Sequence, residues 1–236
     1  ELAYLKIACK ICTEAIEATA HCKERLLSFR FLSEASAADD ILKSFPHFVI
    51  LSKTNIPFVT TRFANDLIPY SNTQNLGLCG IKGMPHSKKI TDDCDLIIAL
   101  GSRFSPTFCL GNPKSFAKDA YCVSVNNDKD ELNLNLKKID LKINENLGEF
   151  LPLLYKGIKN VKFPNFKNWQ KICSIRKNKD IIPNLFNKRN PIDLYRFMYL
   201  LGNKATNKHV LITDAGSNYY IGGQAWHFNN GGKEIS

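Results

Sequence analysis

The segment that most constrains the fold is Asp95-Leu-Ile-Ile-Ala-Leu-Gly101, an unbroken apolar run closed by a glycine. A strand with one face in water alternates apolar and polar residues, and this run does not alternate. Such runs are typical of parallel strands that helices cover on both faces. The rest of the chain therefore has to supply neighbouring strands and the helices that cover them.

Elements of both kinds alternate along the flanking sequence. Strand patterns occur at 26–32, 55–61, 121–125 and 137–143. Helix patterns occur at 4–25, 35–45, 87–93, 115–120 and 147–155. The stretch 65–84 is rich in glycine, proline and asparagine and is expected to be loop. The alternation predicts an α/β fold with a doubly wound parallel sheet over residues 1–155.

A second α/β unit is expected to begin near Asn190. Pro191–Leu201 has helical periodicity, Val210–Ile212 is interpreted as a short buried strand, and a helix pattern follows it. The lysine-rich stretch 156–189 is interpreted as a solvated linker. We therefore expect three parts, 1–155, 156–189 and 190–236, of which the last is the truncated start of a second domain.

The charge distribution and the apolar pattern argue against two classes of partner. The net charge of +10 comes from lysines and arginines that are spread thinly, whereas nucleic-acid binding favours a concentrated basic stripe. Phe163, Phe166 and Trp169 among lysines leave RNA or DNA contact as a weaker alternative. Every apolar run is too short to cross a membrane. We expect neither nucleic acid nor membrane as a partner.

Eight cysteines are scattered along the chain, several of them within apolar strand patterns. This distribution suits reduced, buried thiols in a cytoplasmic protein better than a disulfide framework. The Cys9-Lys-Ile-Cys12 spacing, with His21 and Cys22 nearby, leaves a zinc site as an alternative, although no second CxxC pair follows at finger spacing. The simpler interpretation places Cys9 and Cys12 on one face of a helix.

Polar residues follow three predicted strands at their carboxyl ends, where open parallel sheets bind ligands. They are Thr60-Thr61-Arg62, Gly101-Ser102-Arg103 and Asn126-Asn127-Asp128. Arg103 beside a glycine turn suits a bidentate phosphate contact, and the third group suits ribose hydroxyls. Equally, Gly101 merely turns the chain and Arg103 pairs with a surface carboxylate. Thr61, Arg62, Gly101 and Arg103 are the binding candidates from these ends.

The stretch Thr213-Asp-Ala-Gly-Ser-Asn218 is small and polar and separates the strand and helix patterns of the second unit. A glycine turn between a strand and a helix presents backbone N–H groups to a phosphate, although a tight turn without a ligand has the same pattern. The GxGxxG, GxxxxGK[ST] and GxSxG motifs are absent, and the five histidines lack metal spacing. We assign no catalytic and no metal-binding residue.

An ordered set of segments resembles the thiamine-diphosphate-dependent enzymes of the acetolactate synthase type, from about Arg25 to Ser236. Asn55-Ile-Pro-Phe-Val-Thr-Thr61 resembles the family's "IPVVTT" strand, and Leu76-Gly-Leu-Cys-Gly-Ile-Lys-Gly83 resembles its glycine loop. Cys94-Asp-Leu-Ile-Ile-Ala-Leu-Gly-Ser-Arg-Phe104 resembles its "CDLLIALGSRF" strand and turn. The later matching segments are Lys114–Ala120, Val123–Asp128 with Glu131-Leu132, and Lys138–Phe150.

In this family a PYR domain precedes a central doubly wound domain, and a PP domain follows it. The resemblance implies that residues 1–155 are the central domain and that 190–236 are the N-terminal part of the PP domain. It places the Thr213–Asn218 turn at the cofactor diphosphate, with Ala215, Gly216, Ser217 and Asn218 as contacts. It places the activating glutamate in an upstream PYR domain and the Mg²⁺-binding segment beyond Ser236.

The resemblance implies an enzyme that uses thiamine diphosphate and Mg²⁺ to decarboxylate a 2-keto acid and transfer its acyl group. The intact protein is expected to be a homodimer or homotetramer, and the chain alone is expected to be inactive. FAD binding by the central domain is possible, but Ser124 and Asn126 replace two aspartates of the family, and Ser105-Pro106 replaces an acidic and a basic residue. Gly216-Ser217-Asn218 replaces the Gly-Gln-His of acetolactate synthases.

Two other functions remain open at this point. One is a structural domain without catalysis, whose nucleotide site has been lost. The other is an NAD- or ADP-binding domain unrelated to thiamine, which a buried Thr213–Asn218 turn would favour.

Overall fold

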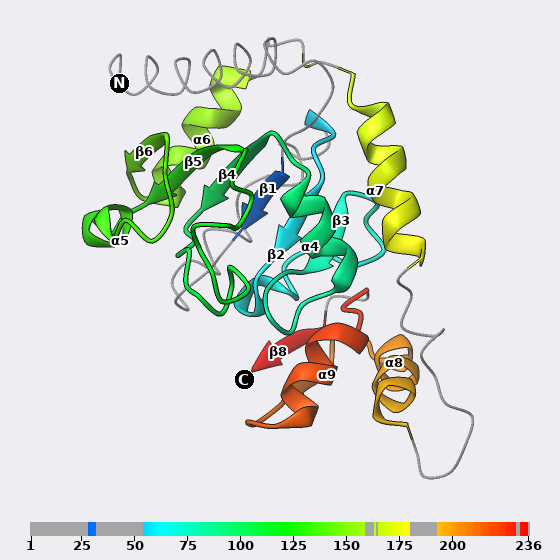
Figure 1. The fold of residues 1–236 in the computed structure, drawn as a ribbon. Coiled ribbons are helices and arrows are strands. Elements are labelled where there is room, and N and C mark those ends of the chain that lie inside the picture. The colour runs from blue at the N-terminus through cyan, green and yellow to red at the C-terminus, as the bar shows by residue number, and fades with distance from the viewer. Residues whose placement is uncertain are drawn as a thin grey trace.

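The computed structural model describes the strand at 28–31 and residues 54–158, 163, 165–179, 193–229 and 232–235 (Figure 1). The helices expected at 4–25 and 35–45, and the Cys9–Cys12 pair, lie outside these residues. The described chain forms two sheets, one of six strands and one of two.

The larger sheet is parallel throughout and has the order β3-β2-β1-β4-β5-β6. Its strands are β1 (Ser28–Phe31), β2 (Phe58–Thr60), β3 (Asn75–Leu78), β4 (Leu96–Leu100), β5 (Tyr121–Asn126) and β6 (Leu141–Asn144). The strand order runs one way from β1 to β3 and the other way from β4 to β6, so the sheet has a switch point between β1 and β4. The predicted doubly wound α/β fold is confirmed.

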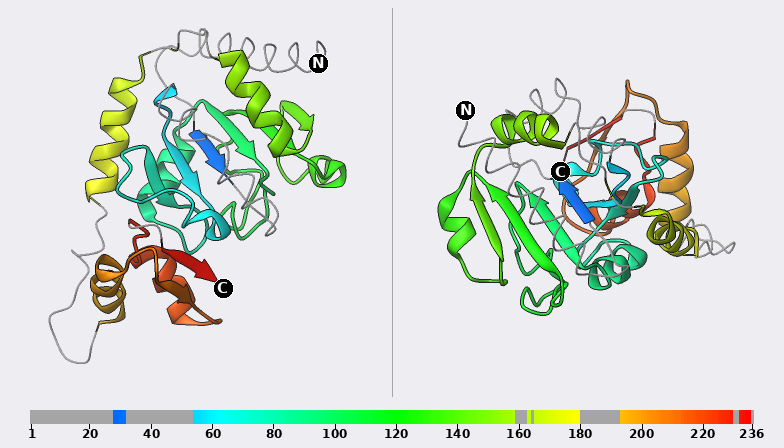
Figure 2. Two further views of the ribbon diagram at one scale, coloured as in Figure 1. Left: turned by 180° about the vertical axis from the view of Figure 1, so that it is seen from behind. Right: turned by 90° about the horizontal axis from the view of Figure 1, so that it is seen from above.

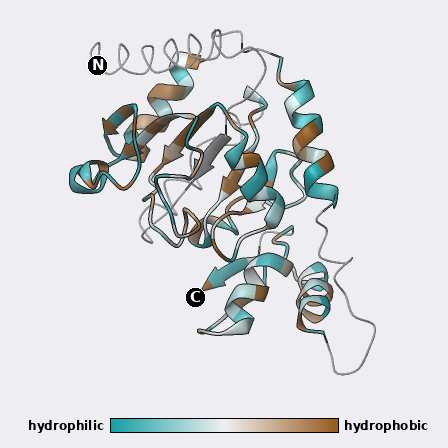
Figure 3. Cartoon of the chain, in the orientation of Figure 1, coloured by the Kyte–Doolittle hydropathy of each residue, from teal (hydrophilic) through white to brown (hydrophobic). Residues whose placement is uncertain are grey.

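Helices cover this sheet on both faces. They are α4 (Pro85–Asp92), α5 (Lys129–Asn133), α6 (Leu147–Ile158) and α7 (Lys167–Lys179). Figure 2 shows α4 and α6 on opposite faces. Every residue of β4 is buried between the layers, as its unbroken apolar sequence predicts. Figure 3 shows the hydrophobic residues gathered along β4 and β5. We call this sheet with α4–α7 the central unit.

The remaining elements form what we call the C-terminal unit, residues 193–229 and 232–235. They are α8 (Leu194–Lys204), β7 (Val210–Ile212), α9 (Ser217–Ala225) and β8 (Lys233–Ile235). Strands β7 and β8 pair in parallel, and Figure 1 shows this unit against one end of the central unit. A second apolar cluster joins the units, because Leu78 and Met84 pack with Met198, Trp226 and Phe228.

Two expectations of local structure in the central unit are wrong. Residues 65–84 contain strand β3, where Gly77 has a φ of +82° and the register against β2 shifts. A glycine at positive φ gives no strand signal, so the short strand was missed. Residues 115–120 form turns instead of a helix, and Ala117 has a φ of +42°. The carbonyls of Phe116 and Ala117 accept hydrogen bonds from the buried Nζ of Lys137.

Other expectations need smaller corrections. Strand β6 begins at Leu141 instead of Lys137, and helix α5 was not predicted. Residues 167–179 are not a solvated linker, because they form α7, whose Trp169 and Cys173 are buried in the central core. Strand β7 exists as expected but is only partly buried, since Leu211 is 7% exposed whereas Val210 is 49% and Ile212 72% exposed.

Candidate functional site

A cavity of about 410 Å³ lies at the carboxyl edge of the larger sheet, and we call it the edge cavity. The loops after β2, β3 and β4 line it, and α9 of the C-terminal unit adds Tyr219 and Tyr220. Its cations are Arg62, Lys82 and Arg103. Phe63 and Phe108 add further aromatic surface. This lining suits a ligand that has both a planar apolar part and an anionic part.

The glycine loop after β3 gives the edge cavity one of its walls. The Met84 N–H donates to the Leu78 carbonyl over 2.7 Å, and the Ile81 N–H donates to the Thr107 carbonyl over 2.9 Å. A Cβ at Gly83 would lie 2.6 Å from the Leu78 carbonyl oxygen, so only glycine fits there. Gly80 has a φ of +126°, a region that favours glycine. The tight fold of this wall therefore depends on glycine at these two positions.

Arg62 connects the edge cavity to the C-terminal unit. It begins the short 3-10 helix η1 (Arg62–Ala64) directly after β2, and its side chain is only 10% exposed. The guanidinium forms an ion pair with Glu234 of β8 and lies 4.2 Å from the centroid of the Tyr219 ring. Its Nη2 donates to the Thr213 Oγ1 over 3.4 Å. One side chain therefore contacts the start of the predicted diphosphate turn, α9 and β8.

Burial dominates the electrostatics of this pair. It lowers the pKa of Arg62, and it raises the pKa of Glu234 to about 7, although each partner acts on the other in the opposite direction. Asp66 raises the pKa of Glu234 further. Removing one partner would leave the other charge buried without compensation, which is costly.

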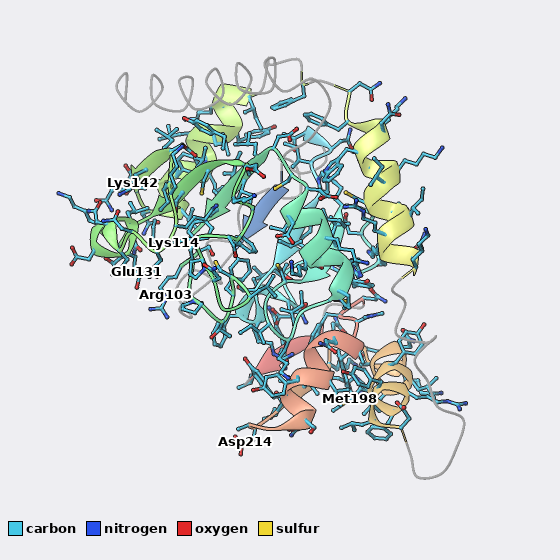
Figure 4. The ribbon with its side chains drawn as sticks, viewed as in Figure 1. Arg103, Lys114, Glu131, Lys142, Met198 and Asp214 are labelled. Carbon is cyan, nitrogen blue, oxygen red and sulfur yellow. The ribbon has the colours of Figure 1, made fainter. Side chains whose placement is uncertain are left out.

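Arg103 and Lys82 are the more accessible cations of the edge cavity. Arg103 Nη1 lies 3.2 Å from Glu131 Oε1, and Figure 4 shows the two residues close together. This is the surface pairing that the simpler interpretation of Arg103 expects, and phosphate binding by Arg103 stays a prediction. Gly101 does not line the cavity; it turns the chain at a φ of +62°, and its N–H donates to the Val125 carbonyl. Lys82 Nζ lies 5.0 Å from the centroid of the Tyr220 ring.

The polar groups after β5 serve local structure. The Asp128 carboxylate caps α5 by accepting from the N–H groups of Asp130 and Glu131. Asn126 accepts the N–H of Asp128, and its backbone carbonyl accepts from Asn144. The predicted ribose contacts from this group stay a prediction, with the side chains of Asn126 and Asp128 already engaged in these hydrogen bonds.

The Thr213–Asn218 turn lies outside the edge cavity. Asp214 through Asn218 are exposed, and Gly216 has a φ of +121° immediately before α9. Figure 4 shows Asp214 at the far end of the C-terminal unit from Arg103. The first N–H groups of a helix have no carbonyl partner within it. Two donors here have side-chain acceptors, since the Ala215 N–H donates to Asp214 Oδ1 over 2.6 Å and the Tyr219 N–H to Asn218 Oδ1 over 2.9 Å. A buried turn would have favoured an NAD- or ADP-binding domain unrelated to thiamine, and the turn is open.

The structure therefore divides the sequence-derived candidates into two places. Thr61, Arg62 and Arg103 line the edge cavity, whereas Ala215, Gly216, Ser217 and Asn218 form the exposed turn. Sequence reasoning missed Lys82, Tyr219, Tyr220 and Glu234 as neighbours of these candidates. The three-residue spacing of Gly77, Gly80 and Gly83 marks the loop that carries Lys82 and could have indicated it. Tyr219, Tyr220 and Glu234 are far from this loop in the sequence, and no pattern links them to it.

Cysteines and metals can be judged only where the structure describes them. Cys79, Cys94, Cys109, Cys122 and Cys173 are free and buried, as expected of reduced core thiols. Burial raises the pKa of Cys173 to about 12, so its thiol stays protonated at neutral pH. Among the described residues, no three His, Cys, Asp or Glu side chains gather as a metal site. No described helix combines the length and apolar character that a membrane crossing needs.

Comparison with known proteins identifies the family. Residues 48–154 match the model of the thiamine pyrophosphate enzyme central domain. The acetolactate synthase large subunit of Lactococcus lactis subsp. lactis is 28% identical over 196 residues, covering 83% of this chain and 32% of the relative. The acetolactate synthase of Mycobacterium bovis is 38% identical over 82 residues, covering 35% of the chain and 13% of the relative.

A more distant relative gives the same assignment. The probable acetolactate synthase large subunit of Methanocaldococcus jannaschii is 25% identical over 173 residues, covering 69% of the chain and 28% of the relative. The chain thus spans about a third or less of the length of these relatives. Five of the six strands of the doubly wound sheet, β2 to β6, fall within the matched residues, so this sheet is the central domain of the thiamine pyrophosphate enzymes, and the chain is similar to acetolactate synthases.

Proposed function

We propose that this chain is part of an enzyme that decarboxylates a 2-keto acid and transfers the acyl group to an acceptor. When bound, thiamine diphosphate supplies the electron sink that removal of CO₂ requires. The observation that carries the proposal is the exposed turn at 214–218, joined to a central domain of this family. The intact protein would be a homodimer or homotetramer in the cytoplasm, where the buried free cysteines would stay reduced.

The residues of the turn suit a diphosphate. Gly216 has no Cβ to obstruct an approaching phosphate, and it lies at a φ of +121° directly before the first N–H groups of α9. Ala215, Ser217 and Asn218 are small and exposed, so they add hydrogen-bonding groups without bulk. These residues would bind and orient the diphosphate. Mg²⁺ would accompany it, and we assign no residue of this chain as its ligand.

The division of the chain follows from this proposal. Residues 1–155 would be the central domain, 156–189 would connect it onward, and 190–236 would begin the diphosphate-binding domain. The sheet of the central unit has an apolar core of its own, distinct from the cluster at the junction with the C-terminal unit, and this supports the division. Helix α7 would then be a connection that packs on the central domain.

Turnover measurements test the proposed function. We expect the 236-residue chain, given thiamine diphosphate, Mg²⁺ and pyruvate, to release no CO₂ and to bind the cofactor weakly or not at all. Protein extended by the flanking coding sequence should decarboxylate at least one 2-keto acid of a panel, and Gly216→Val should reduce that rate at least about tenfold because a side chain at this φ is strained and obstructs the diphosphate.

Each of the two turnover measurements has an outcome that would contradict the proposal it tests. Turnover of pyruvate by the 236-residue chain would overturn the inactivity of the fragment. An extended protein that neither binds thiamine diphosphate nor releases CO₂ would overturn the catalytic proposal.

The edge cavity favours a second candidate, a nucleotide-binding role for the central domain. Its three cations and its aromatic walls suit FAD, ADP or NAD, although the serine and asparagine substitutions on β5 argue against FAD. Calorimetric titration of the chain with each nucleotide separates the cases. Binding of one of them supports the nucleotide role, and binding of none supports a purely structural domain.

A further inference from the structure

We propose that Arg62 is a positioning residue that holds the Thr213–Asn218 turn in place from the end of β2. Its relevance to catalysis rests on the function proposed above, whereas the mechanical role does not. The geometry points to this role because one buried guanidinium joins two units that are far apart in the sequence.

The guanidinium contacts three residues of the C-terminal unit, Thr213, Tyr219 and Glu234, which we call the socket. Thr213 is at the base of the turn, Tyr219 follows the turn in α9, and Glu234 lies on β8. The Thr213 N–H donates to the Ile235 carbonyl over 3.1 Å, so the base of the turn and β8 are also joined to each other. The contacts of Arg62 therefore flank the turn on both sides in sequence. Moving this side chain would release both ends of the turn.

The glycine pair in α9 shows that the helix is shaped around Arg62. A Cβ on Gly223 would overlap the Nη1 of Arg62, and it would also lie 3.1 Å from Leu78 Cδ2. A Cβ on Gly222 would meet only ordinary van der Waals contacts, the nearest at 3.4 Å from Leu211 Cδ2. Adjacent glycines weaken a helix, and the guanidinium accounts for the second of them. A side chain at position 223 would therefore occupy the place of the Arg62 guanidinium.

Neighbouring contacts orient the socket but do not replace Arg62. The Asn65 Nδ2 donates to the Gly223 carbonyl over 3.1 Å, and the Glu234 N–H donates to Asp66 Oδ2 over 3.1 Å. Lys233 Nζ lies 3.5 Å from the same carboxylate. These contacts fix backbone of α9 and β8, whereas Arg62 reaches Thr213 at the turn itself.

A pair of glycine variants tests the role without removing Arg62. Gly223→Ala should displace the flexible end of Arg62 and speed amide hydrogen exchange in 217–225 about tenfold, the effect of losing one charged hydrogen bond. Gly222→Ala is the matched control, because it makes the same chemical change one residue away with room for the methyl group. Exchange in β4 reports whether the central unit is intact. Equal exchange of α9 in both variants would overturn the proposal.

Chemical rescue distinguishes positioning by a guanidinium from a general packing role. Arg62→Ala should speed exchange in 217–225 about tenfold, and millimolar guanidinium ion should restore it, while urea at the same concentration should not. Arg176→Ala, which removes the ion pair to Asp93 between α7 and α4, should leave α9 unchanged. Faster exchange that guanidinium does not reverse would contradict the positioning role. If Arg62→Ala does not fold, the comparison of Gly223→Ala with Gly222→Ala still tests the positioning role of Arg62.

The link to the cofactor needs a separate measurement. Titration of the protein extended by the flanking coding sequence, with and without Gly223→Ala, with Mg²⁺-pyrophosphate should show weaker binding in the variant by about tenfold. Equal affinity in the two proteins would show that Arg62 does not position the turn for a diphosphate. Absence of binding in both, with the exchange difference present, would count against the proposed diphosphate site and leave the mechanical role of Arg62 supported.

Discussion

Strands β4 and β7 carry similar apolar sequences, Leu96–Leu100 and Val210–Ile212, but only β4 is buried along its whole length. Strand β4 has paired neighbours on both sides, β1 and β5, and layers on both faces. Strand β7 pairs only with β8 among the described strands, and its first and third side chains are exposed. An apolar run predicts a strand, whereas burial depends on how many layers surround that strand.

The two units are therefore stabilised differently. The central unit buries a continuous core in which Phe58, Leu100 and Leu151 are at most 1% exposed. The C-terminal unit has a smaller cluster and relies on contacts to its neighbour, such as the Tyr70–His227 ring stack and the Gln224 Nε2 hydrogen bond to the Lys82 carbonyl. We expect the C-terminal unit to open at a lower free energy than the central unit.

The largest expected effect comes from the same substitution made in both sheets. Ile97→Ala in β4 should lower the free energy of unfolding by about 2–5 kcal/mol, because Ile97 is 2% exposed and the core would retain a cavity. Ile212→Ala in β7 should change it by less than about 0.5 kcal/mol, because Ile212 is 72% exposed. Urea unfolding followed by circular dichroism measures both. Similar losses would show that β7 is buried in solution.

Acid should loosen the contact between the units through His227. Burial, with the nearby charge of Lys177, lowers the pKa of His227 to about 4 from its usual 6.5. Between these pH values the unfolded chain takes up a proton on His227 that the folded chain does not. The contribution of His227 to the free energy of unfolding is therefore complete above pH 6.5 and is lost as the pH falls toward 4. It amounts to at most about 3.5 kcal/mol, since a pKa unit corresponds to about 1.4 kcal/mol.

His227→Phe is the matching variant, because a phenyl ring can keep the stack on Tyr70. Hydrogen exchange in α8 and α9 should accelerate from pH 6.5 to 4 more in the unmodified chain than in this variant, after correction for the intrinsic pH dependence. Glu234, with its raised pKa of about 7, acts in the opposite direction in both proteins and cancels in the comparison. Identical pH profiles would exclude His227 as the acid-sensitive group.

The contrast between the central unit and the C-terminal unit also explains how much could be predicted from the sequence. The parallel sheet followed from Asp95–Gly101 and the alternation around it, because unbroken apolar runs depend on a fold with layers on both faces. Strand β3 could not be read from Asn75 and Gly77, since the positive φ of Gly77 and the burial of Asn75 are consequences of tertiary packing. The carboxyl-edge argument brought Thr61, Arg62 and Arg103 to one cavity, but the role of Glu234 depends on how the two units dock.

Helix caps offer a smaller, matched comparison of the two units. Asp193 caps α8 by accepting the N–H of Arg196 over 3.0 Å, and Asp128 caps α5 in the same way. Asp193→Ala should cost about 1 kcal/mol and appear as faster exchange in α8, whereas Asp193→Asn should retain most of the cap. Asp128→Ala should leave α8 unchanged. Faster exchange of α8 in Asp128→Ala would mean that the units unfold as one.

The smallest expected effect concerns an ion pair that lies wholly on the central unit. Lys88 and Asp92 are one helical turn apart on α4, and their side chains are 52% and 35% exposed. Water and salt screen such a pair, so Lys88→Met should change the free energy of unfolding by less than about 0.5 kcal/mol, and the difference should vanish in about 1 M salt. Urea unfolding at low and high salt measures it. A loss above about 1 kcal/mol that persists in salt would show that an exposed ion pair stabilises the central unit. Stabilisation by charged side chains would then not be confined to the junction between the units, where Arg62 pairs with Glu234.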